Sequence, residues 1–195
     1  MKKRKFLPFI IAGACLVLIS FSLLIGFLFS VHIGIRKCDK LVAEMYDILP
    51  DKTVGSPGSY LDANMPVLEI NETDYVALLD IPSFGVTLPV ADKWDSNKLY
   101  LSPARFFGSV YDSTLIIGGF DHPQQLGFGD KIEHGAIVTI TDMTGVQFTY
   151  AVSHVERSKH ANTQWLTEGD CDLTLFYRDL YSMEYIAIRC DLTFN

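Results

Sequence analysis

The feature that most constrains this chain is a long uncharged stretch near its N-terminus. No charged residue occurs from Phe6 to Val31, and a basic cluster over residues 2–5 precedes the stretch. A helix of this length crosses the hydrocarbon core of a bilayer, which is roughly 30 Å thick. We therefore expect a transmembrane signal anchor over residues 6–35, behind a basic tail over residues 1–5.

The basic tail also predicts the orientation of the anchor. Positive charge collects on the cytoplasmic side of a span, so the N-terminus is expected inside and everything after Arg36 outside the cell membrane. A cleaved signal peptide is the alternative, but its apolar core has only about 7–15 residues. A lipoprotein site at Cys15 is disfavoured because only a short apolar run precedes it. We expect an uncleaved single-pass protein.

The net charge narrows the choice of partners. The chain carries a formal charge of −7, which becomes about −11 once the basic tail is set aside. Such an acidic exported part disfavours nucleic acids and anionic lipids as partners, although acidity also serves solubility.

Residues 36–74 are expected to join the anchor to the folded domain in two steps. Apolar residues recur at helical spacing between Arg36 and Leu49, which predicts a short amphipathic helix that Pro50 ends. Residues 51–65 are rich in Gly, Ser, Pro and Asp, which predicts a spacer or an irregular arm.

Residues 75–195 read as a β-domain. Seven short segments are rich in β-branched and aromatic residues, over residues 76–81, 85–90, 114–118, 136–141, 147–155, 172–177 and 184–190. The short link 142–145 ends in Gly and predicts a hairpin. Many short strands with few helices predict a mainly β fold, a closed or nearly closed barrel.

The order of these strands and the short sequence motifs on them resemble those of the sortases, the membrane-anchored cysteine transpeptidases of Gram-positive bacteria. The resemblance covers residues 75–193 and rests on short motifs in the family's order: Ile81-Pro82, Leu88-Pro89-Val90, Arg105 to Ser109, Leu115 to Gly119, Gly135 through Asp142 with Gly145, and Asp172 to Phe176. It implies a sortase-like barrel of about seven to eight strands with short helices. An unrelated extracytoplasmic barrel is the alternative.

The resemblance also implies where a sortase would carry its chemistry. In the family, a cysteine attacks the threonine carbonyl of an LPXTG-like sorting signal, a histidine handles the proton of the leaving amine, and an arginine stabilises the oxyanion. Carried over by motif, the histidine falls on Phe120, the cysteine on Arg178 and the arginine on Tyr185. Phenylalanine cannot exchange a proton, and an arginine that stays protonated cannot act as a nucleophile. The prediction is a degenerate site and a pseudoenzyme.

A relocated catalytic site is the competing interpretation. His122 lies two positions past Phe120, about 6–7 Å further along an extended chain. It lacks an obvious nucleophile, because Cys171 precedes Arg178 by seven residues, or about 23 Å along a strand. A solvated loop histidine is the plainer interpretation of His122. No phosphate-cradling loop or persuasive metal spacing occurs, so we expect no cofactor and no metal.

Three further residues have two interpretations each. Trp165 falls where sortases shape specificity, but it can equally cap the barrel. Cys171 and Cys190 bracket two strands that antiparallel pairing would bring together, so they are either a disulfide worth roughly 3 kcal/mol or two buried thiols.

These residues lead to three functional hypotheses. The first is a pseudoenzyme that binds a peptide, a sorting-signal-like tail or an active sortase, through Arg178, Tyr185, Phe120 and Trp165. Arg178 has a plainer alternative, an ion pair with Asp179, Asp121 or Glu184. The second hypothesis is a residual transpeptidase or hydrolase that uses His122. The third is a structural component of a cell-envelope complex.

Overall fold

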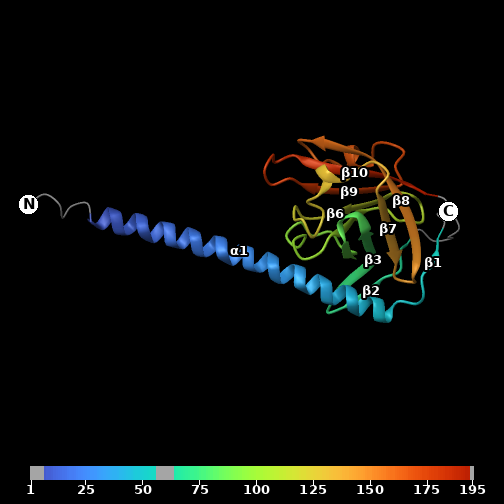
Figure 1. Cartoon of the computed structure of the whole chain (residues 1–195), viewed down its shortest axis with the longest axis horizontal. Coiled ribbons are helices and arrows are strands. Elements are labelled where there is room, and N and C mark those ends of the chain that lie inside the picture. Colours follow the sequence, from blue (N-terminus) through green and yellow to red (C-terminus); the bar gives the residue numbers. More distant parts are fainter. Residues whose placement is uncertain (1–6, 56–63, 194–195) are drawn as a thin grey trace, which may run out of the picture.

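One long helix dominates the N-terminal part of the molecule. The computed structural model describes residues 7–55 and 64–193. Helix α1 (Leu7–Ile48) is continuous over 42 residues and runs out from the β-domain in Figure 1. Its segment Phe9–Ser30 is apolar and long enough to cross a membrane, and no part of it is buried against the domain. The expected juxtamembrane helix is thus the last part of α1, continuous with the span.

The last part of α1 packs on the barrel. Val42 and Met45 are buried in a small apolar cluster with Ile70, Tyr75 and Leu78, and Met45 is 0% exposed. Their spacing puts both side chains on one helix face. The helix ends just before Pro50, as the sequence predicts.

The rest of the described chain is mainly strands. These are β1 (Thr53–Val54), β2 (Leu68–Ile70), β3 (Thr73–Ile81), β4 (Val86–Ala91), β5 (Ala104–Phe107), β6 (Leu115–Gly118), β7 (Ile137–Asp142), β8 (Val146–Ser158), β9 (Leu173–Arg178) and β10 (Tyr185–Leu192). Short helices η1 (Pro82–Phe84), η2 (Gly129–Lys131) and α2 (Thr163–Thr167) lie between them. All seven predicted strands are present, with ends shifted by three residues or fewer.

Eight of these strands close into a barrel. The order around it is β3-β4-β5-β6-β9-β10-β8-β7, and β7 closes the ring because it pairs with both β8 and β3. Alternate strand residues point inward and fill the interior with aliphatic and aromatic side chains. The predicted fold class is confirmed: a mainly β barrel with short helices, behind an apolar N-terminal helix.

The predicted hairpin joins β7 and β8. Asp142 at its start is fully buried, and its Oδ1 accepts hydrogen bonds from the backbone N–H groups of Thr144 and Val146. Its Oδ2 accepts one from the Tyr111 hydroxyl at 2.5 Å. Gly145 has a φ of +83°, which glycine adopts at little cost. The carboxylate therefore fixes the turn and ties it to the core.

Strands β6 and β9 lie side by side and run parallel. Two parallel strands end at the same edge of a sheet, so the loops that follow them emerge together. The loop after β6 also lies near α1, because one cavity is lined by Cys38 of α1, by the start of β4 and by residues 123–125 after β6.

Candidate functional site

The parallel pair bears on the three positions, Phe120, Arg178 and Tyr185, to which the sequence resemblance assigns the family's catalytic residues. Gly118 pairs with Phe176, so Phe120 and Arg178 each follow that pair by two residues. Tyr185 is the cross-strand partner of Arg178. The structure therefore places together the three residues that the family motifs single out.

Arg178 is exposed and lies over the ring of Tyr185, with the guanidinium carbon 5.7 Å from the ring centroid. This is the geometry of a cation–π contact. Within the described parts of the chain, no carboxylate forms an ion pair with Arg178. The guanidinium donors therefore face solvent.

The three acidic residues that the sequence offers to Arg178 are engaged elsewhere. Asp121 accepts a hydrogen bond from the Leu180 N–H at 2.8 Å. Asp179 accepts from the Tyr181 N–H at 2.7 Å, and hydrogen bonds of this kind lower its pKa. Glu184 lies 3.9 Å from Arg157. The ion-pair interpretation of Arg178 is wrong in this structure.

The outer face of the sheet beside this edge is covered by aromatic side chains. Trp94, from the loop between β4 and β5, stacks on Phe176 with ring centroids 5.6 Å apart. Phe106 of β5 meets both rings edge-on, at 5.0 and 5.4 Å. Gly118 permits this packing, because a Cβ there would lie 2.3 Å from the Trp94 ring. The face is a packed surface.

Helix α2 extends this cover and is held down by a buried arginine. Arg189 of β10 is 2% exposed and donates to the backbone carbonyls of Trp165 at 2.6 Å and Leu166 at 2.7 Å. It also donates to Glu156 at 3.1 Å and to the Thr174 hydroxyl at 3.0 Å. The guanidinium thus connects the loop helix to three strands.

Trp165 belongs to this packing. Its indole is half-buried, packs against the apolar cluster of the outer face and lies 5.6 Å from the Arg189 guanidinium. The geometry is that of a side chain that caps the sheet. The sequence predictions did not include Arg189 or Trp94. Arg189 could have been noticed, because it is the one charged residue in the apolar segment from Ile186 to Cys190.

His122 is half-buried in the loop after β6. Its Nδ1 accepts a hydrogen bond from the Gln124 N–H at 3.2 Å. Burial lowers the pKa of His122, and the nearby Asp121 opposes that shift. The ring is therefore held by its own loop.

The cysteine that the fold brings toward this loop is Cys38 of α1. It lines a cavity of about 170 Å³ together with residues 123–125. Burial, with a smaller contribution from Asp39, raises the pKa of Cys38 to about 11, and its thiol bonds to the Leu101 carbonyl. A nucleophilic cysteine needs a lowered pKa, so Cys38 is poorly suited to that role.

Cys171 and Cys190 are both free thiols in the structure. Cys190 is fully buried in the barrel core, and burial raises its pKa. Cys171 is half-buried, and its pKa is also raised, mainly by burial. Cys171 and Cys190 therefore form no disulfide in this structure.

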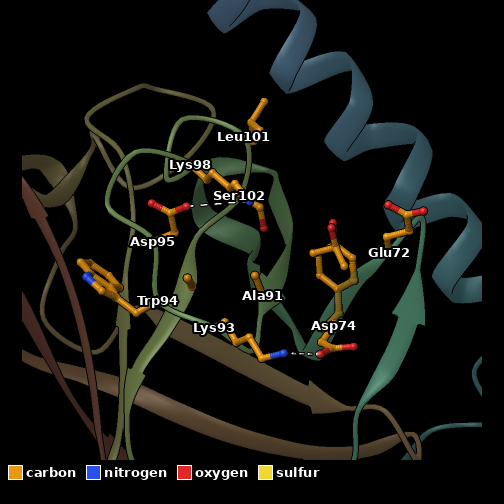
Figure 2. Close-up of a pocket in the computed structure, with 12 residues that line it drawn as sticks. Glu72, Asp74, Ala91, Lys93, Trp94, Asp95, Lys98, Leu101 and Ser102 are labelled. Carbon is orange, nitrogen blue, oxygen red and sulfur yellow. Dashed lines mark hydrogen bonds and ion pairs between the residues drawn. The ribbon is translucent and has the colours of Figure 1, made fainter.

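A separate pocket of about 420 Å³ lies on the other side of Trp94, toward α1. Figure 2 shows Lys93 pointing at Asp74, and Lys98 pointing at Asp95. The two nitrogen–oxygen distances are 3.1 and 3.8 Å. Both lysines are thus matched by carboxylates, and Glu72 adds one further acidic residue to the lining.

No candidate metal site is found among residues 7–55 and 64–193. No group of three or more His, Cys, Asp or Glu side chains is arranged there to hold an ion.

Comparison with known proteins finds similarity at the level of structure. No family model matches the sequence, and no curated protein matches it either. Sortase C1 from Streptococcus agalactiae is similar with a TM-score of 0.56 and 22% identity, over 65% of this chain and 72% of that one. Sortase A from Corynebacterium diphtheriae is similar with a TM-score of 0.55 and 16% identity, over 85% of both chains.

A third similar structure is sortase A from Listeria monocytogenes, with a TM-score of 0.52 and 15% identity. It matches 62% of this chain and 88% of its own. The barrel order, the short helices and these matches agree with one another. The chain therefore has the fold of the sortases.

Proposed function

We propose that the protein is a catalytically inactive, membrane-anchored sortase-fold protein that binds a carboxylate-bearing peptide segment at the edge formed by Phe120, Arg178 and Tyr185. The observation that carries the proposal is the state of Arg178: exposed, stacked on Tyr185 and free of an ion pair in the described chain. A guanidinium in this state suits a carboxylate, which it binds through two parallel hydrogen bonds.

Inactivity follows from the same three residues. The carry-over from the sortase motifs leaves no base at Phe120, no nucleophile at Arg178 and no guanidinium at Tyr185. Loss of the nucleophile alone costs a catalytic triad about a millionfold in rate. A relocated site is disfavoured by the raised pKa of Cys38 and by the loop bonding of His122.

The proposal is tested with the full chain in detergent micelles and fluorescent peptides that carry an LPXTG-like motif and end in a free carboxylate. We expect binding without cleavage, weakened about tenfold by Arg178→Ala because a charge-assisted hydrogen bond is lost. Amidation of the peptide terminus should weaken binding similarly. Lys52→Ala, which removes one exposed charge just before β1, at the opposite end of β8 from the residue that pairs with Tyr185, is the matched control and should leave binding unchanged.

Two results would contradict the proposal in different ways. Peptide turnover that His122→Ala abolishes would show an active enzyme. Equal binding by the wild type and Arg178→Ala would remove the arginine from the binding site.

The packed outer face favours a second candidate, a structural component of an envelope complex. Trp94, Phe106 and Phe176 pack against one another on the outer face of the sheet, with ring centroids 5.0 to 5.6 Å apart. A structural protein of this kind would show neither peptide binding nor turnover, and would instead co-purify with envelope partners.

A further inference from the structure

The turn between β9 and β10 presents three exposed apolar side chains. Tyr181 is 98% exposed, and Leu180 and Met183 are 53% and 52% exposed. Backbone hydrogen bonds close the turn, from Asp179 N–H to the Glu184 carbonyl at 2.8 Å and from Met183 N–H to the Asp179 carbonyl at 2.9 Å. The fold therefore holds these apolar groups outward on a defined turn.

This turn lies on the side of the barrel that faces the transmembrane segment. Asp121 bonds to the backbone of Leu180, and the residues after Asp121 share a cavity with Cys38 of α1. Cys38 follows the end of the span at Ser30 by eight residues, or about 12 Å along a helix. In Figure 1 the turn that joins β9 and β10 is the part of the barrel that reaches furthest toward the N-terminal end of α1.

We propose that the turn, through Leu180, Tyr181 and Met183, inserts into the headgroup region of the same membrane that α1 crosses. Headgroups extend about 5–7 Å beyond the hydrocarbon core on each side, about half of the roughly 12 Å of helix between Ser30 and Cys38. Tyrosine is enriched at that depth because its ring is apolar and its hydroxyl stays hydrated.

The contact is apolar in character. The turn carries Asp179 and Glu184, and Arg157 lies within 4 Å of both carboxylates, so the local charges nearly cancel. The exported part is also acidic overall. Attraction to anionic lipid therefore contributes little, and burial of the three side chains supplies the free energy.

The test uses the full chain in phospholipid nanodiscs, with or without bromine atoms on the acyl chains as quenchers. Tyr181→Trp adds an indole at the turn, and Val54→Trp is the matched control. Val54 is 80% exposed, and β1 lies at the end of the barrel away from the span. The emission of the wild-type protein gives the fluorescence contributed by Trp94 and Trp165, which is subtracted from that of each variant.

We expect most of the emission added by Tyr181→Trp to be quenched in brominated discs and blue-shifted in unbrominated ones, whereas Val54→Trp shows neither effect. The quenching should persist in high salt. Equal behaviour of the two variants would overturn the proposal and leave the turn to a protein partner. Quenching that disappears in high salt would overturn the apolar contact. Peptide binding through Arg178 is measured separately, so the two proposals can fail independently.

Discussion

At the scale of single residues, the buried Arg189 connects α2 to the barrel. Its guanidinium is buried between β10 and α2, where it donates to Thr174, to two backbone carbonyls and to the partly exposed Glu156. A buried carbonyl that loses its donor keeps the cost of desolvation without the bond. The position of α2 over the outer face therefore depends on this one side chain.

We predict that Arg189→Met lowers the free energy of unfolding by about 2–4 kcal/mol, because methionine keeps much of the volume but leaves the buried acceptors unpaired. Chemical denaturation of the full chain in detergent, followed by tryptophan fluorescence, measures the loss. Arg178→Met on the neighbouring strand is the control, with an expected change within about 0.5 kcal/mol because that side chain is exposed. Equal effects of the two substitutions would contradict the assigned role.

At the scale of elements, an apolar contact fixes the last part of α1 to the barrel. The buried Met45 and Val42 supply its apolar part, and the thiol of Cys38 is shielded in the same interface. Because burial keeps the pKa of Cys38 near 11, this thiol is protonated at neutral pH and reacts slowly. Its reactivity therefore reports on how firmly the helix is docked.

We predict that Met45→Ala raises the alkylation rate of Cys38 at least about tenfold, since a buried Met→Ala change costs about 2–5 kcal/mol. Peptide mapping by mass spectrometry assigns the label to Cys38 among the four cysteines. Glu44→Ala, an exposed change one residue away, should leave the rate unchanged. If Met45→Ala also left it unchanged, the helix would not depend on this apolar contact.

The elements differ in how well the sequence predicts them. Strands of four or more alternating or apolar residues, such as β7 and β8, are evident from composition and turn residues. Strands β1 and β2 have two and three residues and carry too little pattern to detect. The continuity of α1 through Arg36 was also missed, because charged residues after an apolar run suggest a boundary, while nothing there breaks a helix.

At the scale of the whole molecule, motif order predicts the barrel better than overall similarity does. Identity to the similar solved structures is only 14–22%, yet TM-scores of 0.51 to 0.56 show the same fold. The motifs single out Phe120, Arg178 and Tyr185, and the pairing of β9 with β6 and with β10 puts their backbone positions at one edge of the sheet. The packed outer face was not foreseen, because Trp94 reaches it from a loop distant in sequence.

We predict that the barrel lies outside the cytoplasm. Alkaline phosphatase fused after residue 195 should be active, because it folds only after export, and a fluorescent protein fused there should be dark. Replacing the basic residues 2–5 with glutamine should reduce the exported fraction, since Arg36 and Lys37 would then carry the larger positive charge. An exported fraction that does not change when residues 2–5 are replaced would contradict the prediction that the basic tail sets the orientation.

The unbroken α1 has a consequence for how the protein would meet the proposed peptide ligand. A domain on a flexible linker sweeps a volume above the membrane and captures ligands from solution. Here the apolar segment and the docked segment are one helix, so a membrane crossed by that segment would hold the edge with Arg178 at a fixed height. Encounters then depend on lateral diffusion and on the surface density of the ligand, and ligands held at the same height within the membrane plane are favoured over those in bulk.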